Sequence, residues 1–275
     1  MTAFENVVIG KSSIPSLTIT IVLMIAIPVV SLIYWCRKHR QQTNIGYLIA
    51  GIIGFLVSAR VLELGVHYLC IISDNPVSRF INAKTFAYVL YGITMAGVFE
   101  ECGRYIILRF ILRKNRTPEN AVLYGIGHGG IEILAVLLPS MILYLVIAVF
   151  FSSGDVDSAL SVLNITEETA SSALPSVLAA ASFDYHLMAM NVLERILAMI
   201  AHIGLTVIVF YGVSRSKKGF LPMAIILHML MDIFPALYQR GILPLWAVEL
   251  WVAVWVAVIA MIALRLYRNS RPQES

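Results

Sequence analysis

The sequence predicts an all-α fold, a polytopic transmembrane bundle of about seven helices. Hydrophobic residues make up 59% of the 275-residue chain and charged residues only 13%. A soluble domain is usually about half apolar and about a quarter charged. The apolar runs are roughly 20 residues or longer, which suits helices better than the shorter alternating strands of a barrel. We therefore expect a single integral membrane domain that covers residues 1–275.

The first four predicted spans follow one another with short connections. The first covers residues 14–35 and ends at a basic cluster, and the second covers residues 45–72. The third covers residues 86–112. The fourth begins near residue 120 and continues to 151, because a proline such as Pro139 kinks a helix without ending it.

The last three predicted spans cover residues 187–213, 220–238 and 244–267. Between the fourth and fifth spans lies the longest loop, residues 152–186, which carries five acidic residues and no Lys or Arg. The residues with catalytic character fall between about 86 and 238, so we expect this part of the chain to form the core.

Basic residues predict the orientation in the membrane. They follow every second span, whereas the loop 152–186 is acidic. Because cytoplasmic loops carry an excess of Lys and Arg, the N-terminus is predicted outside and the C-terminus in the cytoplasm, as an odd number of spans requires. Arg79 and Lys84 count mildly against this assignment. The basic residues that support it are Arg37, Lys38, Arg40, Arg113, Lys114, Arg116, Arg215, Lys217, Lys218, Arg265, Arg268 and Arg271.

The same observations exclude other classes of protein. The net charge of +4 does not indicate nucleic-acid binding, because the basic residues cluster in short loops as membrane topology predicts. Cys36, Cys70 and Cys102 are too few and too scattered for a disulfide framework or a thiolate metal site. Compact basic loops without a targeting segment favour a bacterial plasma membrane.

Ionisable residues interrupt four of the predicted spans. Such a group at membrane depth costs several kcal/mol and usually marks a functional site. Four segments that each carry such groups predict one polar site in the core of the bundle. His67, by contrast, is interpreted as a lone histidine of the second span. The residues concerned are Glu100, Glu101 and Arg104 in the third span, His128 and Glu132 in the fourth, Glu194, Arg195 and His202 in the fifth, and His228 and Asp232 in the sixth.

The third span carries two adjacent carboxylates near one cation. Glu100 and Arg104 are one helical turn apart and share a face, and Glu101 is rotated from Glu100 by about 100°. We expect Arg104 to neutralise one carboxylate and leave the other to act. The alternative is an ion pair that only holds helices together.

The fourth and sixth spans each place a histidine one turn from a carboxylate. His128 and Glu132 are four residues apart, as are His228 and Asp232, so each pair shares a face. Four glycines in residues 125–130 allow close approach of another helix or of a substrate backbone. A carboxylate one turn from a histidine orients the imidazole, or both ligate a metal. A tight packing seam with a hydrogen-bonded histidine is the alternative.

Two chemistries fit this set of residues. In the first, Glu100 and His128 hold and deprotonate a water, and His202 or His228 donates to the oxyanion of a tetrahedral intermediate. In the second, a divalent metal such as Zn²⁺ activates the water. Its ligands would be His128, Glu132, His202 and His228. The sequence contains neither the HExxH motif of zincins nor a serine in a GxSxG turn.

Taken together, these residues resemble the YhfC family of intramembrane metalloproteases, which is related to the PrsW proteases and to the CAAX prenyl endopeptidase and bacteriocin-processing superfamily. The resemblance covers nearly the whole chain. It implies that Glu100 activates the water with His128 as its partner. It also implies roles for Glu101, which would pair with Arg104, for His228, which would stabilise the oxyanion with Asp232 beside it, and for His202 as a further shared histidine.

We therefore predict an intramembrane endopeptidase with the catalytic residues Glu100, Glu101, Arg104, His128, His202, His228 and Asp232. Its partners would be membrane lipid and a membrane-embedded or membrane-proximal peptide or protein, with no nucleic acid. One alternative is an ion-coupled or metal transporter that uses the same histidines and carboxylates. The other is a catalytically inactive binding or immunity protein.

Overall fold

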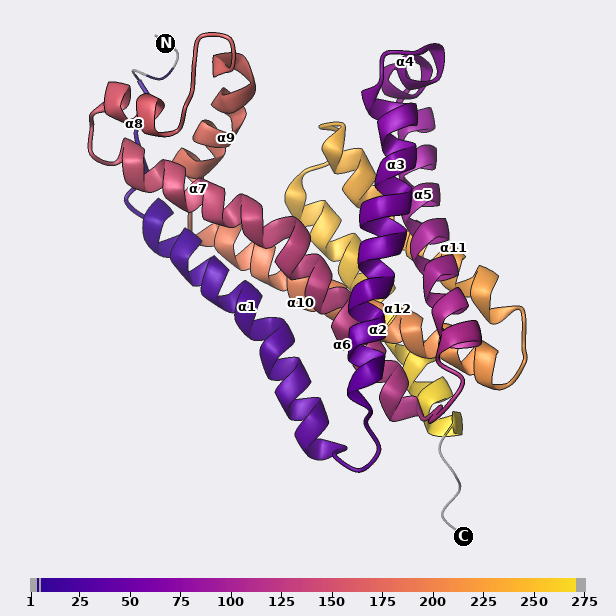
Figure 1. Ribbon diagram of the computed structural model, residues 1–275. Helices are drawn as coiled ribbons and strands as arrows, with labels where there is room; N and C mark the ends of the chain where they lie inside the picture. The colour runs from indigo at the N-terminus through magenta and orange to yellow at the C-terminus, as the bar shows by residue number, and fades with distance from the viewer. Residues whose placement is uncertain (1–3, 5, 271–275) are drawn as a thin grey trace. The chain divides into compact units, whose positions relative to one another are not determined.

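The computed structural model describes residue 4 and residues 6–270, and this part of the chain contains helices and no strands (Figure 1). Six of its helices are long and apolar enough to cross a membrane. They begin and end within a few residues of the predicted spans. The six are Ser13–Lys38, Ile45–Ile72, Pro118–Phe151, Tyr185–Ser214, Phe220–Gln239 and Leu245–Ser270.

The remaining predicted span is α5, Thr85–Ile106, which a π-helical segment, η4 (Ile107–Ile111), extends. It has 22 residues, and its three buried ionisable side chains, Glu100, Glu101 and Arg104, make it less apolar than the six other helices. It packs against α11, Phe220–Gln239. The all-α polytopic fold of about seven spans is confirmed.

Two of the spans are interrupted by π-helical segments. The second consists of α2 (Ile45–Phe55), η2 (Leu56–Glu63), α3 (Leu64–His67) and η3 (Tyr68–Ile72). The fourth consists of α6 (Pro118–Glu132), η5 (Ile133–Leu137) and α7 (Leu138–Phe151). Pro139 lies in the first turn of α7, where a missing backbone N–H costs little. The prediction that this span continues past Pro139 is confirmed.

The other helices complete the chain. α1 is Ser13–Lys38, α10 is Tyr185–Ser214 and α12 is Leu245–Ser270, while α4 (Pro76–Ala83) lies between the second span and α5. The acidic loop 152–186 contains two short helices, α8 (Val156–Val162) and α9 (Ala170–Ser182).

The chain forms two compact units, so that the expectation of a single domain stays a prediction. One unit consists of residues up to Ile27 together with Ile133–Arg195, and the other of Pro28–Glu132 and Ile196–Ser275. In the first unit, hydroxyl groups of α1 bind the end of α9. Ser13 Oγ donates to Ala181 O at 2.9 Å, and Ser16 Oγ donates to Phe183 O at 3.0 Å.

The second unit contains every residue predicted to be catalytic, and glycines let its helices pack closely. A side chain at Gly125 on α6 would lie 2.6 Å from Ile203 Cα on α10. Gly127, two residues later and therefore on the opposite side of α6, lies against the backbone of Leu48 on α2. On α5, a side chain at Gly97 would lie 2.8 Å from Met229 Cγ of α11. The glycine run therefore does serve as a helix-packing seam, on two sides of α6.

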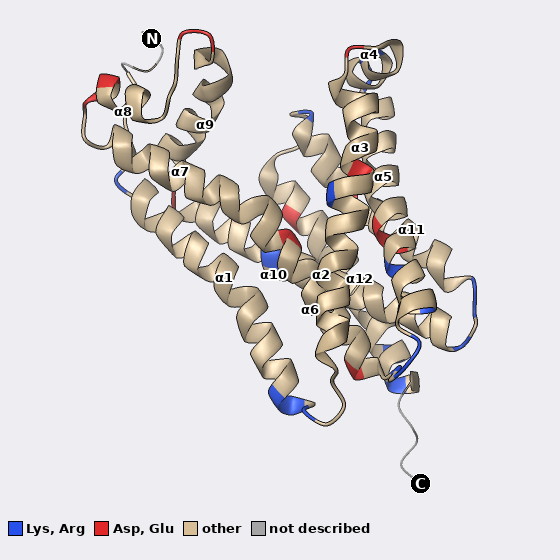
Figure 2. Cartoon of the chain, in the orientation of Figure 1, with Lys and Arg blue, Asp and Glu red and all other residues tan. Residues whose placement is uncertain are grey.

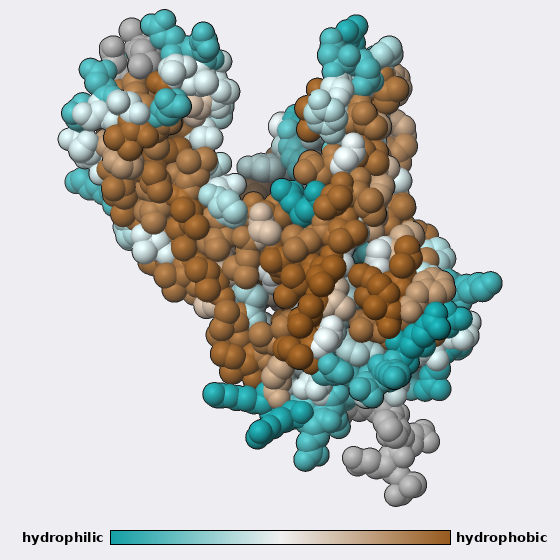
Figure 3. Space-filling view, in the orientation of Figure 1, coloured by the Kyte–Doolittle hydropathy of each residue, from teal (hydrophilic) through white to brown (hydrophobic). Residues whose placement is uncertain are grey.

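In the second unit, basic and acidic residues lie at different positions along the helices. Figure 2 shows Lys and Arg at the end of α1, in the loop after α5, in the loop before α11 and near the end of α12, all at the same end of this unit. The acidic positions on α5 lie within the bundle. In Figure 3 the surface along the long helices is brown, hence apolar, and the basic end is teal. This arrangement supports the predicted cytoplasmic side.

Gly125 provides a test of the close packing between α6 and α10. The variant Gly125→Ala places a methyl group against backbone, where neither helix can give way without moving as a whole. We expect a loss of stability of about 1–3 kcal/mol, measured by unfolding in detergent. Gly65→Ala is the control, because a side chain there meets no atom within 4 Å. Equal stability of the two variants would contradict the close approach.

Candidate active site

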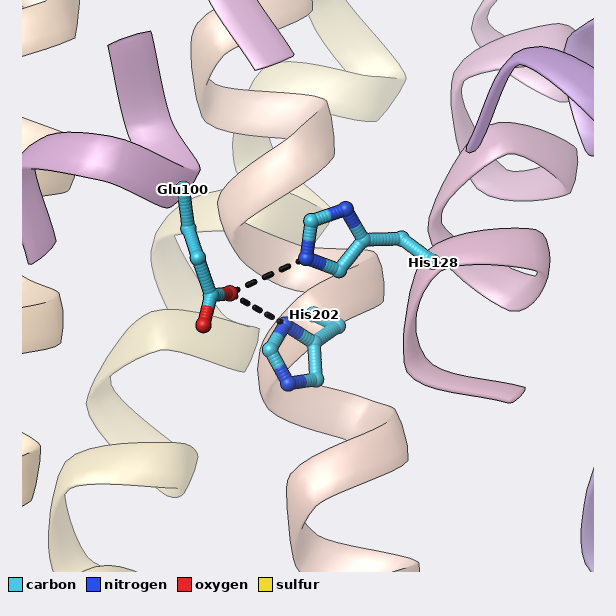
Figure 4. A group of neighbouring side chains, drawn as sticks. All are labelled: Glu100, His128 and His202. Atoms are coloured by element: carbon cyan, nitrogen blue, oxygen red, sulfur yellow. Dashed lines mark hydrogen bonds and ion pairs between the residues drawn. The ribbon is translucent and has the colours of Figure 1, made fainter. Parts of the chain in front are cut away.

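Three polar side chains from three helices of the second unit meet at one point. Glu100 of α5 places its Oε2 3.0 Å from His128 Nε2 of α6 and 3.8 Å from His202 Nδ1 of α10. All three residues are buried, with 7%, 0% and 4% of their surfaces exposed. Figure 4 shows one carboxylate oxygen of Glu100 facing a nitrogen of each imidazole. At 3.0 Å the carboxylate accepts a hydrogen bond from His128 Nε2–H.

The second carboxylate of the pair, Glu101, forms an ion pair with Arg104. Both side chains are completely buried. The spacing in sequence put Arg104 on the face of Glu100, four residues earlier, and left open which carboxylate it neutralises. The partner is Glu101, three residues earlier, as the family resemblance implied. Arg104 Nη2 also lies 3.3 Å from His202 Nδ1. Arg104 thus neutralises Glu101, and Glu100 is left facing the two histidines.

His228 of α11 is held between two carboxylates. Its Nδ1 lies 2.9 Å from Glu101 Oε1, and its Nε2 lies 3.4 Å from Asp232 Oδ2, one turn further along the helix. Both ring nitrogens can donate at once only in the imidazolium form. The shared partner, Glu101, therefore links the ion pair with Arg104 to His228.

Glu132 contacts His202 rather than His128. The i,i+4 spacing puts Glu132 and His128 on one face of α6, but His128 reaches across to Glu100 and Glu132 forms an ion pair with His202 Nε2. A carboxylate against Nε2 favours a proton on that nitrogen and leaves Nδ1 with its lone pair. That lone pair points toward Glu100 and Arg104.

The predicted metal ligands are not all neighbours. Glu100, His128 and His202 each offer one ligand atom, and these atoms all lie within 4.8 Å of one another. Tetrahedral zinc with bonds of about 2.0–2.2 Å needs ligand atoms about 3.4 Å apart, and the distances of 3.0 and 3.8 Å lie on either side of this value. Glu132 and His228 are outside this group.

The charges of this network also suit a cation. Glu100, Glu101 and Asp232 supply three carboxylates to this network and Arg104 supplies one guanidinium, so two negative charges remain when the imidazoles are neutral. Buried charge without a partner is costly, so this excess favours protons on the histidines or a bound cation. Two histidines and a carboxylate are a common ligand set of catalytic zinc. The residues present therefore fit a divalent metal.

Residues 23–253 match the family model described as YhfC intramembrane metalloprotease. The chain belongs to this family. It is 29% identical over 262 residues to a protein of Bacillus subtilis (strain 168) described as uncharacterized membrane protein YhfC, with 94% of this chain and 96% of the relative covered. No solved structure matches the chain. The resemblance seen in the residues of the third to sixth spans is thus confirmed, and so is an integral membrane protein.

A further polar group of this YhfC-family chain was not predicted from its sequence. His67 is not a lone histidine: its Nε2 lies 3.2 Å from Glu63 Oε1, and its Nδ1 lies 2.8 Å from the Tyr91 hydroxyl. The i,i+4 spacing of Glu63 and His67 was the available signal. Glu194 and Arg195 of the first unit form an ion pair with each other.

Arg104→Ala tests the buried ion pair. The change leaves the carboxylate of Glu101 buried beside Glu100 without its cation, so we expect a loss of about 3–5 kcal/mol in unfolding experiments in detergent. Arg113→Ala, at an exposed arginine of the next loop, should change stability by no more than about 0.5 kcal/mol. The double variant Glu101→Gln/Arg104→Ala should recover part of the loss. Similar stability of all three variants would refute the role of the pair.

Proposed function

We propose that this protein is an intramembrane endopeptidase that hydrolyses a peptide bond in or beside the membrane, and that Glu100 and His128 activate the attacking water. The observation that carries the proposal is the meeting of Glu100, His128 and His202 from three different helices. A packing seam needs the glycines of α6 but gives no reason for a buried carboxylate between two imidazoles. Membership of a family of intramembrane metalloproteases supports the same class of reaction.

In the proposed reaction, Glu100 is the base and His128 is its partner. Glu100 accepts a proton from water, and the oxygen of that water bonds to the carbonyl carbon of the substrate. The proton then passes to the leaving amine nitrogen as the carbon–nitrogen bond breaks. His128, 3.0 Å from Glu100, orients the carboxylate and the water. General acid–base catalysis of this kind contributes about 100- to 10,000-fold in rate.

His228 is the proposed donor to the oxyanion. Glu101 fixes its Nδ1, and the other nitrogen, Nε2, is only 3.4 Å from Asp232, a long contact that a substrate oxygen can replace. The side chain of Asp232 is 26% exposed, whereas that of Glu101 is completely buried. The accessible side of the imidazole is therefore the Nε2 side. A donor fixed before the reaction costs no reorganisation when the negative charge develops.

In the alternative, metal-dependent form of this hydrolysis, Glu100, His128 and His202 would instead hold a divalent metal, for which Zn²⁺ is the proposed identity. When bound, such an ion supplies a Lewis acid that lowers the pKa of its water. Glu132 would orient His202 through Nε2, as carboxylates commonly do for metal-bound histidines.

Glu100→Gln tests the proposed base. The amide keeps the size of the side chain and cannot accept a proton, so cleavage of a membrane peptide should fall by about 100- to 10,000-fold. The detergent-purified protein should unfold at nearly the same temperature as the parent protein. Glu168→Gln, the same change at an exposed loop position, should retain full activity. Loss of folding in Glu100→Gln would show instead that Glu100 is a structural residue.

The metal content of purified variants tests the three-residue site. We expect about one zinc ion per chain in the parent protein. His128→Ala and His202→Ala should lose the metal, because each removes one of three ligands. His228→Ala should retain it, since His228 lies outside the group. Equal loss from His228→Ala would contradict this assignment, and metal-free protein that cleaves a membrane peptide would leave Glu100 and His128 as a metal-independent pair.

A further inference from the structure

A cavity of about 480 Å³ lies next to the proposed active site. Its walls come from η2, α3, η3, α5 and α11, all in the second unit. At its inner end are Asp232, which contacts His228, and Ala96, one helical turn before Glu100. At its outer end are Tyr88 and Gln239, about 11 Å further along their helices on the predicted external side. The cavity therefore leads from the external side toward the reacting residues.

The cavity has a polar wall at membrane depth. Glu63, His67 and Tyr91 form a chain of contacts across it, with distances of 3.2 and 2.8 Å. Glu63 is only 8% exposed. A buried carboxylate and imidazole are expensive beside lipid tails and usually face water or a polar ligand. The proposed hydrolysis does not use these three residues, so they indicate that this space takes something other than acyl chains.

The π-helical segments on either side of α3 give the same indication. η2 ends at Glu63, and η3 begins at Tyr68, directly after His67. Departures from the α-helix of this kind are frequently found at functional sites. They occur here at the helix wall that carries the polar chain.

The space is large enough for a substrate side chain. Pockets that hold small ligands measure about 300–1,000 Å³. A Cβ atom added to Gly92, one of the lining residues, would meet no atom within 4 Å, so the backbone of α5 is open to the cavity there.

The charged residues that line the cavity determine which charge a bound side chain can carry. The charged lining residues are Glu63, Asp232 and, when protonated, His67, and the described lining includes no lysine or arginine. Arg240 stacks on the ring of Tyr88 at 5.1 Å, outside the lining at the outer end. A cleft lined by carboxylates concentrates cations and repels anions.

We propose that this cavity is the pocket that receives the substrate side chain next to the scissile bond, and that it admits neutral or basic side chains and excludes acidic ones. This assignment rests on the proposed peptidase function. It makes Gly92 and Asp232 determinants of specificity, Gly92 through the space it leaves open and Asp232 through its charge.

Gly92→Leu fills the cavity and tests the pocket. Membrane-spanning model peptides with Lys, Ala or Asp beside the cleaved bond are compared in detergent. In the parent protein, Lys and Ala peptides should be cleaved and the Asp peptide at least about tenfold more slowly. In Gly92→Leu the ratio of the Lys rate to the Ala rate should fall about tenfold, because the long side chain no longer fits. Gly65→Leu, at an exposed glycine with equal free space, should leave the ratio unchanged.

Thiol labelling tests the same cavity without a substrate. Cys36, Cys70 and Cys102 are replaced by alanine, and Gly92→Cys is treated in membranes with a trimethylammonium-bearing or a sulfonate-bearing methanethiosulfonate. Relative to the exposed control Ser153→Cys, Gly92→Cys should favour the cationic reagent by about tenfold. Asp232→Asn should reduce this preference. Gly65→Cys should react with both charged reagents more slowly than Gly92→Cys does.

The two experiments separate the pocket from the peptidase function. An unchanged rate ratio in Gly92→Leu, or labelling of Gly92→Cys no faster than that of Gly65→Cys, would overturn the pocket. A parent protein that cleaves none of the peptides, while Gly92→Cys still favours the cationic reagent, would overturn the peptidase function and with it the pocket's role in substrate binding. The accessible acidic cavity would then stand as a site for another cation.

Discussion

The buried ion pair between Glu101 and Arg104 is the interaction on which the rest of the site depends. Arg104 brings a permanent cation to a network that contains the carboxylates of Glu100, Glu101 and Asp232, and neither partner of the pair is exposed. In a membrane interior such a charge is tolerated only when its partners are close and fixed. Because Glu101 is occupied by Arg104 and His228, its neighbour Glu100 remains to face His128 and His202. The two glutamates have the same side chain, so the difference between their proposed roles comes from the residues that each one contacts.

Close helix packing makes these contacts possible. The hydrophobic effect does not drive helices together within lipid, because lipid tails are as apolar as the helix surfaces. Van der Waals contact between closely packed small residues stabilises the association instead. Gly125 and Gly127 on α6 meet α10 and α2, and Gly97 on α5 meets α11. These approaches bring histidines and carboxylates of four helices within hydrogen-bonding distance. The glycine seam and the polar site are therefore two parts of one arrangement.

The sequence predicts the spans well and the contacts poorly, for a physical reason. Apolar length decides whether a helix crosses the membrane, and every span boundary predicted from it lies within a few residues of a helix end. Spacing along one helix tells which residues share a face, but it does not tell which neighbouring helix that face meets. Thus Glu132 shares a face with His128 but contacts His202. The spacing left open which glutamate Arg104 neutralises, and the pair with Glu101 is the one that the family resemblance implied. His67 shows the opposite error, since its partner Glu63 was one turn away on the same helix.

Hydrolysis inside a membrane needs water at a place that lipid keeps dry. The proposed base, Glu100, lies well inside its span, about 16 Å from the end of that span at Ile111. Water and substrate therefore need a polar route, and a route between lipid-facing helices must be lined by groups that hydrate it. Glu63, His67 and Tyr91 are polar groups of this kind, placed beside Asp232 and hence beside His228. The need for water at membrane depth therefore explains these three polar residues as well as those of the proposed catalytic group.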